Sequence, residues 1–388
     1  MKVAFATIAF QALRPLANVF YAIIKLLRPP KHKITFISRQ SAAATVDFTL
    51  LKSELSIQDR SLKIKMICSA DAALTGRPAR KARQTIVELW HIANSSAVVL
   101  DSYTPAVSYF SQRKDLYVLQ MWHSLGEIEH FEWQCADTVA GVDVRLARAL
   151  RMHANYSEIL VAGAPMREVF RHAFRTSRSR IQILPLPRID VLRSPDTNRI
   201  DMLMSEHRKY FASSPVILYV PAVRKTTVQQ KDWADNFAQL LEAVESIKAT
   251  LIIKADHWES DIQHLIPDSS HLIFNPIVDL LDLLVMADHV ITDYHGVAFE
   301  AAVARKPLWL FVPDYVEHYS TVGLNIDLRQ QFLQTSFATA TQLVSQLHQS
   351  VLPSDEQEHF LKQYVYFPQT VSVTAAKQIA RSILQGIQ

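Results

Sequence analysis

Short apolar runs alternate with longer amphipathic segments along most of the chain. The runs at 33–38 (KITFIS), 97–101 (AVVLD) and 216–220 (VILYV) are bounded by polar or turn residues, a pattern typical of buried strands. Segments such as 80–93 and 233–247 instead place apolar residues at helical spacing. Regular alternation of the two patterns predicts βαβ units and mostly parallel sheets.

Two such series occur, separated by a stretch of different composition. Residues 176–200 contain three prolines and five arginines with little periodicity, which predicts an interdomain connection. The simplest architecture is two Rossmann-like α/β domains, at 33–185 and 186–388, that face each other across a cleft. The helix predicted at 374–387 packs either on the second domain or back on the first.

The N-terminal segment, residues 1–32, has a character of its own. It is largely apolar but interrupted by Arg14 and Pro15, so no apolar run is long enough to span a bilayer. Residues 15–27 predict an amphipathic helix that lies in a headgroup region; the alternative is a helix that packs on its own domain. The cationic side chains that would face the headgroups are Arg14, Lys25, Arg28, Lys31 and Lys33.

Composition narrows the class of partner. The net charge of +4 and the pI of about 8.9 fit an anionic substrate or a membrane surface but are too weak to indicate nucleic acid. Cys68 and Cys135 have no CxxC spacing, so neither a disulfide framework nor a zinc site is expected, and a reducing cytoplasm is the default. We find no metal-ligand spacing and expect no metal.

Residues 291–313 (ITDYHGVAFEAAVARKPLWLFVP) predict a strand, a short turn, a helix of small residues and a second strand. A strand that leads through a turn into a helix presents backbone N–H groups and the positive end of the helix dipole, which favours phosphate. Asp293 stands where the strand ends, a usual place for a functional carboxylate. The alternative is that Asp293 only caps the helix and His295 is a solvated turn residue.

Reactive side chains also follow other predicted strands, and in a parallel sheet all of them lie at the carboxyl edge, where ligands bind. Asp101 ends the run 97–101, and Ser102 follows it. His123 follows the next strand, and Gly126 after it leaves room for a substrate. As a neutral imidazole, His123 can accept a proton from an attacking hydroxyl; the alternative is a core histidine beside Trp122.

Cationic residues gather at the strand ends of the second series. Lys254 and His257 follow a strand, and His257 is suited to bond a phosphate oxygen; the alternative is a surface loop. Arg188 would form a bidentate phosphate contact or pair with Asp190 in the connection. Arg224 follows the strand 216–220.

Several of these motifs occur in an order that resembles a known family. The segments are 101–103 (DSY), 120–126 (QMWHSLG), 152–156 (MHANY), 187–190 (PRID), 217–224 (ILYVPAVR), 291–294 (ITDY) and 313–314 (PD). Together they cover residues 97–327 and resemble the CDP-glycerol glycerophosphotransferase family of wall teichoic acid synthesis, in its short priming type. The apolar, basic N-terminus also fits this peripheral membrane family.

The resemblance implies a GT-B type fold, with an acceptor-binding domain at 33–185 and a CDP-donor-binding domain at 186–388. The implied reaction transfers glycerol phosphate or ribitol phosphate from a CDP-activated donor to a hydroxyl of a polyprenyl-diphosphate-linked saccharide and releases CMP, with no cofactor. It implies an enzyme on the cytoplasmic face of the bacterial cell membrane; homo-oligomerisation stays open. By this resemblance the catalytic residues are His123, as the general base, and His257, which would hold the donor pyrophosphate. The donor-binding residues are Arg188, Arg224, Lys254, Asp293, Tyr294, His295, Gly296 and Glu300, while Asp101, Ser102 and Gly126 lie on the acceptor side.

The sequence departs from the family pattern at several positions. His295 and Gly296 replace serines, Glu300 replaces an aspartate, Trp258 replaces a proline, Val322 replaces an arginine, and Glu127, Glu129 and His130 replace residues that tend to be lysines. These departures leave the polyol, the acceptor and the number of units added open. Two other functions remain in competition, a GT-B glycosyltransferase that uses a nucleotide sugar and a catalytically lapsed membrane-bound scaffold.

Overall fold

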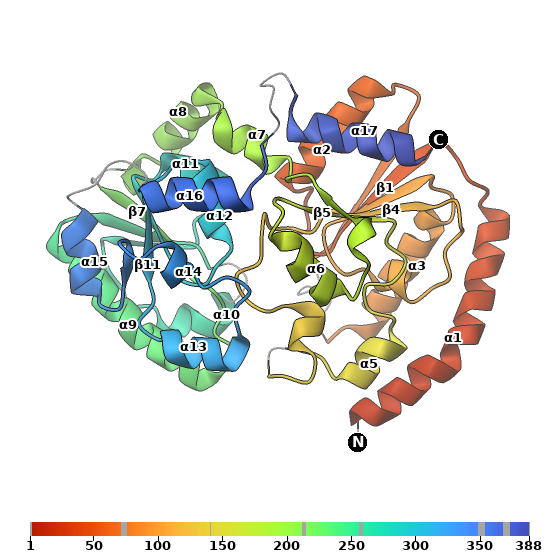
Figure 1. Ribbon diagram of the computed structural model, residues 1–388, viewed down its shortest axis with the longest axis horizontal. Helices are drawn as coiled ribbons and strands as arrows, with labels where there is room; N and C mark the ends of the chain where they lie inside the picture. Colours follow the sequence, from red (N-terminus) through yellow and green to blue (C-terminus); the bar gives the residue numbers. More distant parts are fainter. Residues whose placement is uncertain are drawn as a thin grey trace. The chain divides into compact units, whose positions relative to one another are not determined.

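A computed structural model of the protein describes residues 2–70, 76–139, 141–211, 215–255, 259–347, 354–367 and 373–387 (Figure 1). Within these ranges the strands form two six-stranded sheets, and the strand pairings in both sheets are parallel. Contacts divide the chain into two compact units. Unit 1 comprises Met1–Ser124, Phe131–Arg188 and Tyr366–Gln388, and unit 2 comprises Leu125–His130 and Ile189–Val365.

The sheet of unit 1 has the strand order β2-β1-β3-β4-β5-β6. Its strands are β1 (Lys33–Ser38), β2 (Lys63–Cys68), β3 (Ala97–Leu100), β4 (Tyr117–Gln120), β5 (Glu158–Val161) and β6 (Ile181–Ile183). Its helices are α1 (Lys2–Leu27), α2 (Val46–Gln58), α3 (Pro78–Ile92), α4 (Pro105–Ser108), α5 (Val144–Ala149), α6 (Met166–Phe174) and α17 (Ala375–Gly386). The C-terminal α17 packs against α2, so the chain ends in the unit where it began.

The sheet of unit 2 has the order β12-β11-β10-β7-β8-β9. Its strands are β7 (Val216–Val220), β8 (Thr250–Ile253), β9 (Leu272–Phe274), β10 (His289–Thr292), β11 (Leu308–Phe311) and β12 (Ser336–Phe337). Its helices are α7 (Arg188–Arg193), α8 (Thr197–Glu206), α9 (Thr227–Ser246), α10 (Glu259–Ile262), α11 (Leu280–Met286), α12 (Val297–Val303), α13 (Tyr315–Val322), α14 (Leu328–Gln331), α15 (Ala340–Leu347) and α16 (Asp355–Tyr364). Side chains of α9 and α15 share one buried core with the sheet, and α12 packs against α16.

Each sheet has a point at which its strand order reverses. In unit 1 the chain moves from β1 outward to β2 and then returns to β3 on the other side of β1. In unit 2 it moves from β7 through β8 to β9 and then returns to β10 on the other side of β7. Because crossovers are right-handed, this reversal places helices on both faces and opens a crevice at the carboxyl ends of the two central strands.

The predicted α/β class and the parallel sheets are confirmed, and several strands, including β1, β7 and β10, begin and end where the apolar pattern placed them. The stretch 176–200, predicted as the interdomain connection, does contain the boundary between the two units, which falls after Arg188, but it has more regular structure than its pattern indicated. This stretch contains β6, α7 and the start of α8. Its arginines and prolines obscured a three-residue strand (IQI) whose Ile181 is buried.

Helix α1 also differs from expectation, because it runs unbroken through Pro15. A proline inside a helix leaves the carbonyl four residues earlier without its N–H partner. Here Gln11 and Pro15 are both exposed, so water can satisfy that carbonyl. The helix is long and apolar enough to cross a membrane by length and composition, which corrects the expectation that no such run exists.

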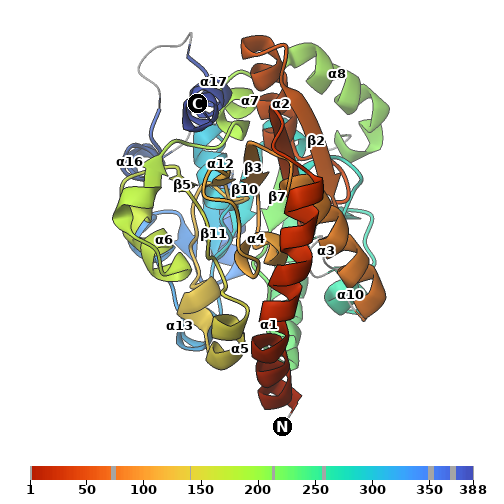
Figure 2. The same cartoon turned by 90° about the vertical axis from the view of Figure 1, so that its right-hand side faces the viewer.

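The outer side of α1 is unusual for a surface helix, because it carries large apolar side chains. The inner side of α1 packs on unit 1 through the buried Tyr21 and Ile24. Polar bonds add to this packing: the Tyr21 hydroxyl donates to Gln112 (2.8 Å), Lys25 Nζ donates to the Ser111 carbonyl (2.8 Å), and Asn18 accepts from the Ser111 N–H (2.7 Å). Figure 2 shows α1 along the outside of unit 1. Its exposed large apolar side chains include Phe5, Ile8, Leu13, Leu16, Val19, Ile23 and Leu26.

One member of the predicted cationic surface lies elsewhere. Lys33 begins β1 and is buried, with Nζ bonded to the His91 carbonyl (3.0 Å) and to Asn94 Oδ1 (2.6 Å). Burial and the nearby cations lower the pKa of Lys33 to about 8. Lys33 therefore belongs to the interior of unit 1, and its assignment to the headgroup-facing cations is wrong.

Candidate active site

In unit 2 the strand order reverses between β7 and β10, so the carboxyl ends of these two strands lie side by side. Arg224 follows the end of β7, and Asp293 follows the end of β10. Asp293 follows β10 directly and is fully buried. Its Oδ1 accepts from the Ala222 N–H (2.7 Å) and from the Tyr294 N–H, and its Oδ2 accepts from the Arg224 guanidinium (2.9 Å). Asp293 thus fastens the end of β10 to the end of β7.

Arg224 is 1% exposed and is held by two carboxylates. Besides Asp293, its Nε donates to Asp314 (2.8 Å), and its Nη1 donates to the Ala222 carbonyl (2.8 Å). Burial alone would lower the pKa of Arg224, but the charges of Asp293 and Asp314 outweigh it and raise the pKa. Burial raises the pKa of Asp293, and the Arg224 charge opposes that shift. In this structure the charge of Arg224 is balanced inside the protein, and its predicted contact with donor phosphates stays a prediction.

Tyr294 extends this network. Its hydroxyl donates to Asp314 Oδ1 (3.1 Å), and its ring stacks on His318 with centroids 4.0 Å apart and planes 10° apart. The guanidinium of Arg224 lies 5.3 Å from the centroid of the same ring. Burial, together with Asp314 and Asp293, raises the pKa of the Tyr294 phenol well above its ordinary value. Tyr294 is therefore a neutral hydrogen-bond donor that ties the turn to α13.

The turn between β10 and α12, residues 293–296, was predicted to bind phosphate through its backbone. In the structure the first N–H groups of α12 are already bonded to this turn: Val297 donates to His295 Nδ1 (3.0 Å), Ala298 to the His295 carbonyl (3.3 Å), and Phe299 to the Gly296 carbonyl (3.0 Å). Helix α12 is short, with seven residues, and Gly296 is its N-cap residue. A phosphate at this turn would therefore depend on side chains more than the sequence suggested.

Among the side chains of this turn, His295 is best placed to supply a hydrogen-bond donor to a phosphate. Because an N–H can only donate, Nδ1 of His295 must accept from Val297, which puts the ring hydrogen of the neutral form on Nε2. Asp293 bonds to Ala222, Tyr294 and Arg224, so it does more than cap a helix. The alternative reading of the turn as a simple solvated cap does not describe Asp293.

The other residues predicted to bind the CDP-activated donor lie in several places. Arg188 is the last residue of the segment Phe131–Arg188 of unit 1. Its Nε and Nη2 both donate to Oδ2 of Asp47 in α2, at 2.9 and 2.6 Å. Lys254 follows β8 and donates to the Pro276 carbonyl (2.7 Å). Glu300 is buried in α12. His257, together with Trp258, lies outside the described residues.

In unit 1, His123 has a geometry that suits a proton acceptor. Its Nδ1 lies 3.0 Å from the backbone carbonyl of Asp101. A carbonyl oxygen can only accept, so Nδ1 carries the hydrogen and Nε2 of the neutral ring keeps its lone pair. The centroid of the His123 ring lies 4.3 Å from that of the Trp122 ring. Trp122 has a φ of 64°, a conformation that non-glycine residues seldom adopt. Gln120 Oε1 holds this backbone by accepting from the Trp122 N–H (2.9 Å).

Asp101 and Ser102 stand beside His123 at the reversal point of unit 1. Both are buried, and the Ser102 hydroxyl donates to Asp101 Oδ1 (2.8 Å). Burial raises the pKa of Asp101, and the hydrogen bonds from its neighbours oppose this shift. The prediction that these residues share one strand end with the His123 region is confirmed, since β3 pairs with β4.

Gly126 does not provide the predicted room for a substrate. It belongs to unit 2, and a Cβ at this position would come within 2.3 Å of the Phe299 ring. The space above Gly126 is filled by that ring, so packing explains the glycine. Its assignment to the acceptor side stays a prediction.

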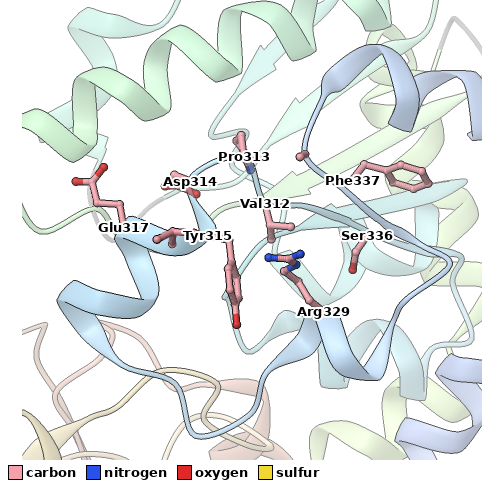
Figure 3. Close-up of a pocket in the computed structure, with 10 residues that line it drawn as sticks. Val312, Pro313, Asp314, Tyr315, Glu317, Arg329, Ser336 and Phe337 are labelled. Carbon is pink, nitrogen blue, oxygen red and sulfur yellow. The ribbon is translucent and has the colours of Figure 1, made fainter.

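A cavity of about 490 Å³ lies at the carboxyl ends of β11 and β12 (Figure 3). Asp314, Tyr315, Glu317 and Arg329 line it with Ser336 and Phe337. The Arg329 guanidinium lies 4.2 Å from the Tyr315 ring centroid, and the Tyr315 hydroxyl donates to Asp327 (2.8 Å). Asp314 therefore takes part both in the Arg224 network and in the wall of this cavity.

Two structural partners were missed by sequence reasoning. Asp47, the partner of Arg188, reads in the sequence as an ordinary acidic residue in the first turn of a helix. His318 pairs with Glu129 across 189 residues of sequence. No local pattern links residues so far apart, although the departures from the family pattern at residues 127–130 already marked that segment.

Comparison with known proteins gives consistent results. A model of the family described as CDP-Glycerol:Poly(glycerophosphate) glycerophosphotransferase matches residues 19–385. A teichoic acid ribitol-phosphate primase of Bacillus spizizenii is 24% identical over 304 residues, 77% of each chain. A teichoic acid glycerol-phosphate primase of Bacillus subtilis is 24% identical over 234 residues, 60% of this chain and 59% of that protein, so the match spans less than two thirds of this second relative.

Solved structures agree on the fold. The wall teichoic acid polymerase TagF superposes with a TM-score of 0.70 at 15% identity, over 100% of this chain and 98% of the other. The Staphylococcus aureus MnaA–UDP structure superposes with a TM-score of 0.55 at 13% identity, over 91% and 96%. The α/β fold with two parallel sheets is thus shared with TagF and, less closely, with MnaA. Since the family model covers most of the sequence, the chain belongs to the CDP-glycerol:poly(glycerophosphate) glycerophosphotransferase family and is a transferase of that type.

Proposed function

We propose that the enzyme transfers glycerol phosphate or ribitol phosphate from a CDP-activated donor to a hydroxyl of a polyprenyl-diphosphate-linked teichoic acid precursor and releases CMP. The observation that supports it best is the tautomer of His123. With Nδ1–H bonded to the Asp101 carbonyl, Nε2 is the basic atom. Among the relatives, the printed names include both ribitol-phosphate and glycerol-phosphate primases, so both donors are candidates.

The proposed step balances as a single displacement. Nε2 of His123 accepts the proton of the acceptor hydroxyl as that oxygen attacks the β-phosphorus of the donor. The bond between the β-phosphorus and the oxygen bridging to CMP breaks, and CMP leaves with the bonding pair. Such a loose phosphoryl transfer depends on positioning and on neutralising charge. We propose Lys254, His257 and His295 for the neutralisation, since Arg224 is already balanced by two carboxylates.

A substrate panel tests the reaction class. The full-length protein is incubated with a polyprenyl-diphosphate saccharide acceptor and with CDP-glycerol, CDP-ribitol or UDP-sugars, and the released nucleotide is measured. We expect CMP release with one or both CDP-polyols. Turnover with UDP-sugars alone would contradict the proposal and favour the nucleotide-sugar glycosyltransferase, and no turnover with any donor would favour the lapsed scaffold.

The role of His123 has its own test. Replacing it by alanine should lower kcat by about 10²–10⁴-fold, the usual contribution of a general base. The affinity for CDP, measured by calorimetry, should stay within about twofold because His123 contacts the acceptor. His264→Ala, a change of an exposed histidine in unit 2, is the control and should leave turnover unchanged. Unchanged turnover in His123→Ala would remove His123 as the base.

We also propose that α1 attaches the enzyme to the membrane surface at which a polyprenyl-linked acceptor resides. The support is the row of exposed apolar side chains on its outer side, while its inner side is fixed to unit 1 by polar bonds. Deletion of residues 1–27 should release the protein from anionic lipid vesicles in a sedimentation assay. A milder test is Leu16→Glu with Ile23→Glu, which changes two exposed positions. If both forms sediment with lipid as the full chain does, α1 is not the anchor.

A further inference from the structure

The segment Leu125–His130 leaves the first sheet immediately after His123 and Ser124 but is built into unit 2. The Glu129 backbone forms an antiparallel bridge with Leu324. The His130 N–H donates to the Gly323 carbonyl (3.0 Å), and the Asn325 N–H donates to the Ile128 carbonyl (2.7 Å). The segment is therefore an extra strand-like edge on the loop that follows α13.

Gly323 is fitted to this contact. Its φ is +77°, a value that side-chain-bearing residues rarely adopt, and a Cβ would come within 2.3 Å of His130 Nδ1. Both its conformation and the close approach of His130 require glycine. The attachment of the segment to unit 2 is thus specified by the sequence on both sides.

The side chain of Glu129 connects the segment to a buried histidine of α13. Its Oε1 lies 2.5 Å from His318 Nε2, and the His318 side chain is buried. A carboxylate only accepts, so Nε2 carries the hydrogen and the imidazole is fixed in orientation. The fixed ring stacks on Tyr294 at 4.0 Å, and the Tyr294 hydroxyl donates to Asp314, which holds Arg224.

These contacts form one continuous chain from the segment to the β10–α12 turn. It runs from Glu129 to His318 by a hydrogen bond, from His318 to Tyr294 by stacking, and from Tyr294 through Asp314 and Arg224 to Asp293 by hydrogen bonds. Buried networks of this kind fix geometry when their members are paired. None of these bonds needs a ligand, so the turn is held in place before any substrate arrives.

We propose that Glu129 and His318 are positioning residues that set the β10–α12 turn for a nucleoside diphosphate donor through Tyr294. The inference deepens the proposed function and rests on it for the identity of the donor. Because the Glu129 carboxylate accepts from His318 Nε2, the two residues act as a matched pair.

The test is a double-mutant cycle read by donor affinity. Glu129→Ala and His318→Phe are made singly and together in the full-length protein, and the Kd for CDP and the KM for CDP-glycerol are measured. Each single change should weaken CDP binding by about tenfold, the size of one hydrogen bond to a charged group. The double variant should be no weaker than the singles, because both remove the same contact. The acceptor KM should stay within about twofold in all three.

Two further variants separate positioning from loss of folded protein. Glu129→Gln keeps an acceptor oxygen for His318 and should restore CDP affinity to within about twofold of the wild type. Glu242→Gln, on the exposed side of α9, removes a carboxylate elsewhere in unit 2 and should change nothing. If Glu129→Ala does not fold, His318→Phe alone decides, since it keeps a ring on Tyr294.

The outcomes are distinct. Unchanged CDP affinity in the single variants, with or without lower kcat, overturns the positioning role and leaves the transferase proposal intact. Wild-type protein that binds CDP but turns over neither CDP-polyol contradicts the proposed function, while the variants still report on the turn. Wild-type protein that does not bind CDP overturns both.

Discussion

The two units place an aspartate at the same point of the same fold and treat its charge differently. Asp101 follows β3 and Asp293 follows β10, each directly beside the first strand of its sheet. Each accepts from an N–H that follows that first strand, Arg39 in unit 1 (3.3 Å) and Ala222 in unit 2 (2.7 Å). Both carboxylates are buried, and burial raises the pKa of both.

The difference is the counter-charge. Asp293 bonds to the guanidinium of Arg224, whereas the bonds to Asp101 come from neutral groups, the Ser102 hydroxyl and the Arg39 N–H. Lys33 of unit 1 is likewise bonded to neutral partners. A compensated buried pair is insensitive to pH near neutrality but costly to break, while an uncompensated buried charge is cheap to replace and shifts its pKa. The comparison therefore contrasts an aspartate whose charge is compensated at the reversal point of unit 2 with one bonded by neutral groups at the reversal point of unit 1.

Breaking the compensated pair should have the largest effect. Arg224→Met leaves Asp293 and Asp314 buried without a cation, and loss of one partner from such a group costs about 3–5 kcal/mol of unfolding free energy. Urea denaturation measures it. Arg305→Met is the control, because Arg305 pairs with Glu358 at the surface and such pairs contribute about 0–1 kcal/mol. Equal losses in the two variants would show that the Arg224 network contributes no more to stability than a surface ion pair.

Lys33 provides the second prediction, because it is a buried cation of unit 1 that is bonded to neutral partners. Its folded pKa of about 8 lies below the ordinary 10.5, so between these values the unfolded state binds more protons. Stability should therefore rise as pH increases from about 8 to 10.5, by at most about 3 kcal/mol. Lys33→Met should abolish this rise. The exposed Lys31→Met is the matched control and should keep it. A rise that persists in Lys33→Met would mean that another group titrates.

How much of this was visible in the sequence depends on the range of the interaction. The strands β1, β7 and β10 were predicted with their observed bounds because their apolar runs are local signals. Strand β6 was missed, since a three-residue edge strand among arginines and prolines leaves no periodicity to detect. The course of α1 through Pro15 was missed because tolerance of a proline depends on whether the freed carbonyl faces solvent, a property of packing.

The candidate site follows the same rule. The strand-end residues His123, Asp101 and Asp293 were found because parallel strands bring their carboxyl ends to one edge. Their partners were not, since the bonds of Arg188 to Asp47 and of Glu129 to His318 join positions 141 and 189 residues apart. Arg224 was correctly placed at a strand end but read as a free cation. Its two carboxylates become its neighbours only when the loops that follow β10 and β11 meet.

The smallest effect should come from Asp101→Asn, and it probes the comparison most directly. Below pH 3.8 both the folded and unfolded states hold the proton, so the carboxyl carries no penalty. As pH rises above 3.8 the unfolded state releases its proton first, because the folded pKa is raised, and the wild type loses stability. The asparagine keeps the acceptor for Ser102 and has no proton to lose, so relative to the wild type it should gain stability as pH rises to 7.

Asp115→Asn supplies the opposite slope within the same unit. A hydrogen bond from Arg113 lowers the pKa of Asp115, so its carboxylate contributes stability above pH 3.8 that is lost as pH falls. Relative to the wild type, Asp115→Asn should therefore weaken as pH rises, while Asp101→Asn strengthens. Thermal or urea unfolding at pH 3, 5 and 7 separates the two. Parallel slopes would show that Asp101 is compensated after all, and the two reversal points would then differ in sequence but not in electrostatics.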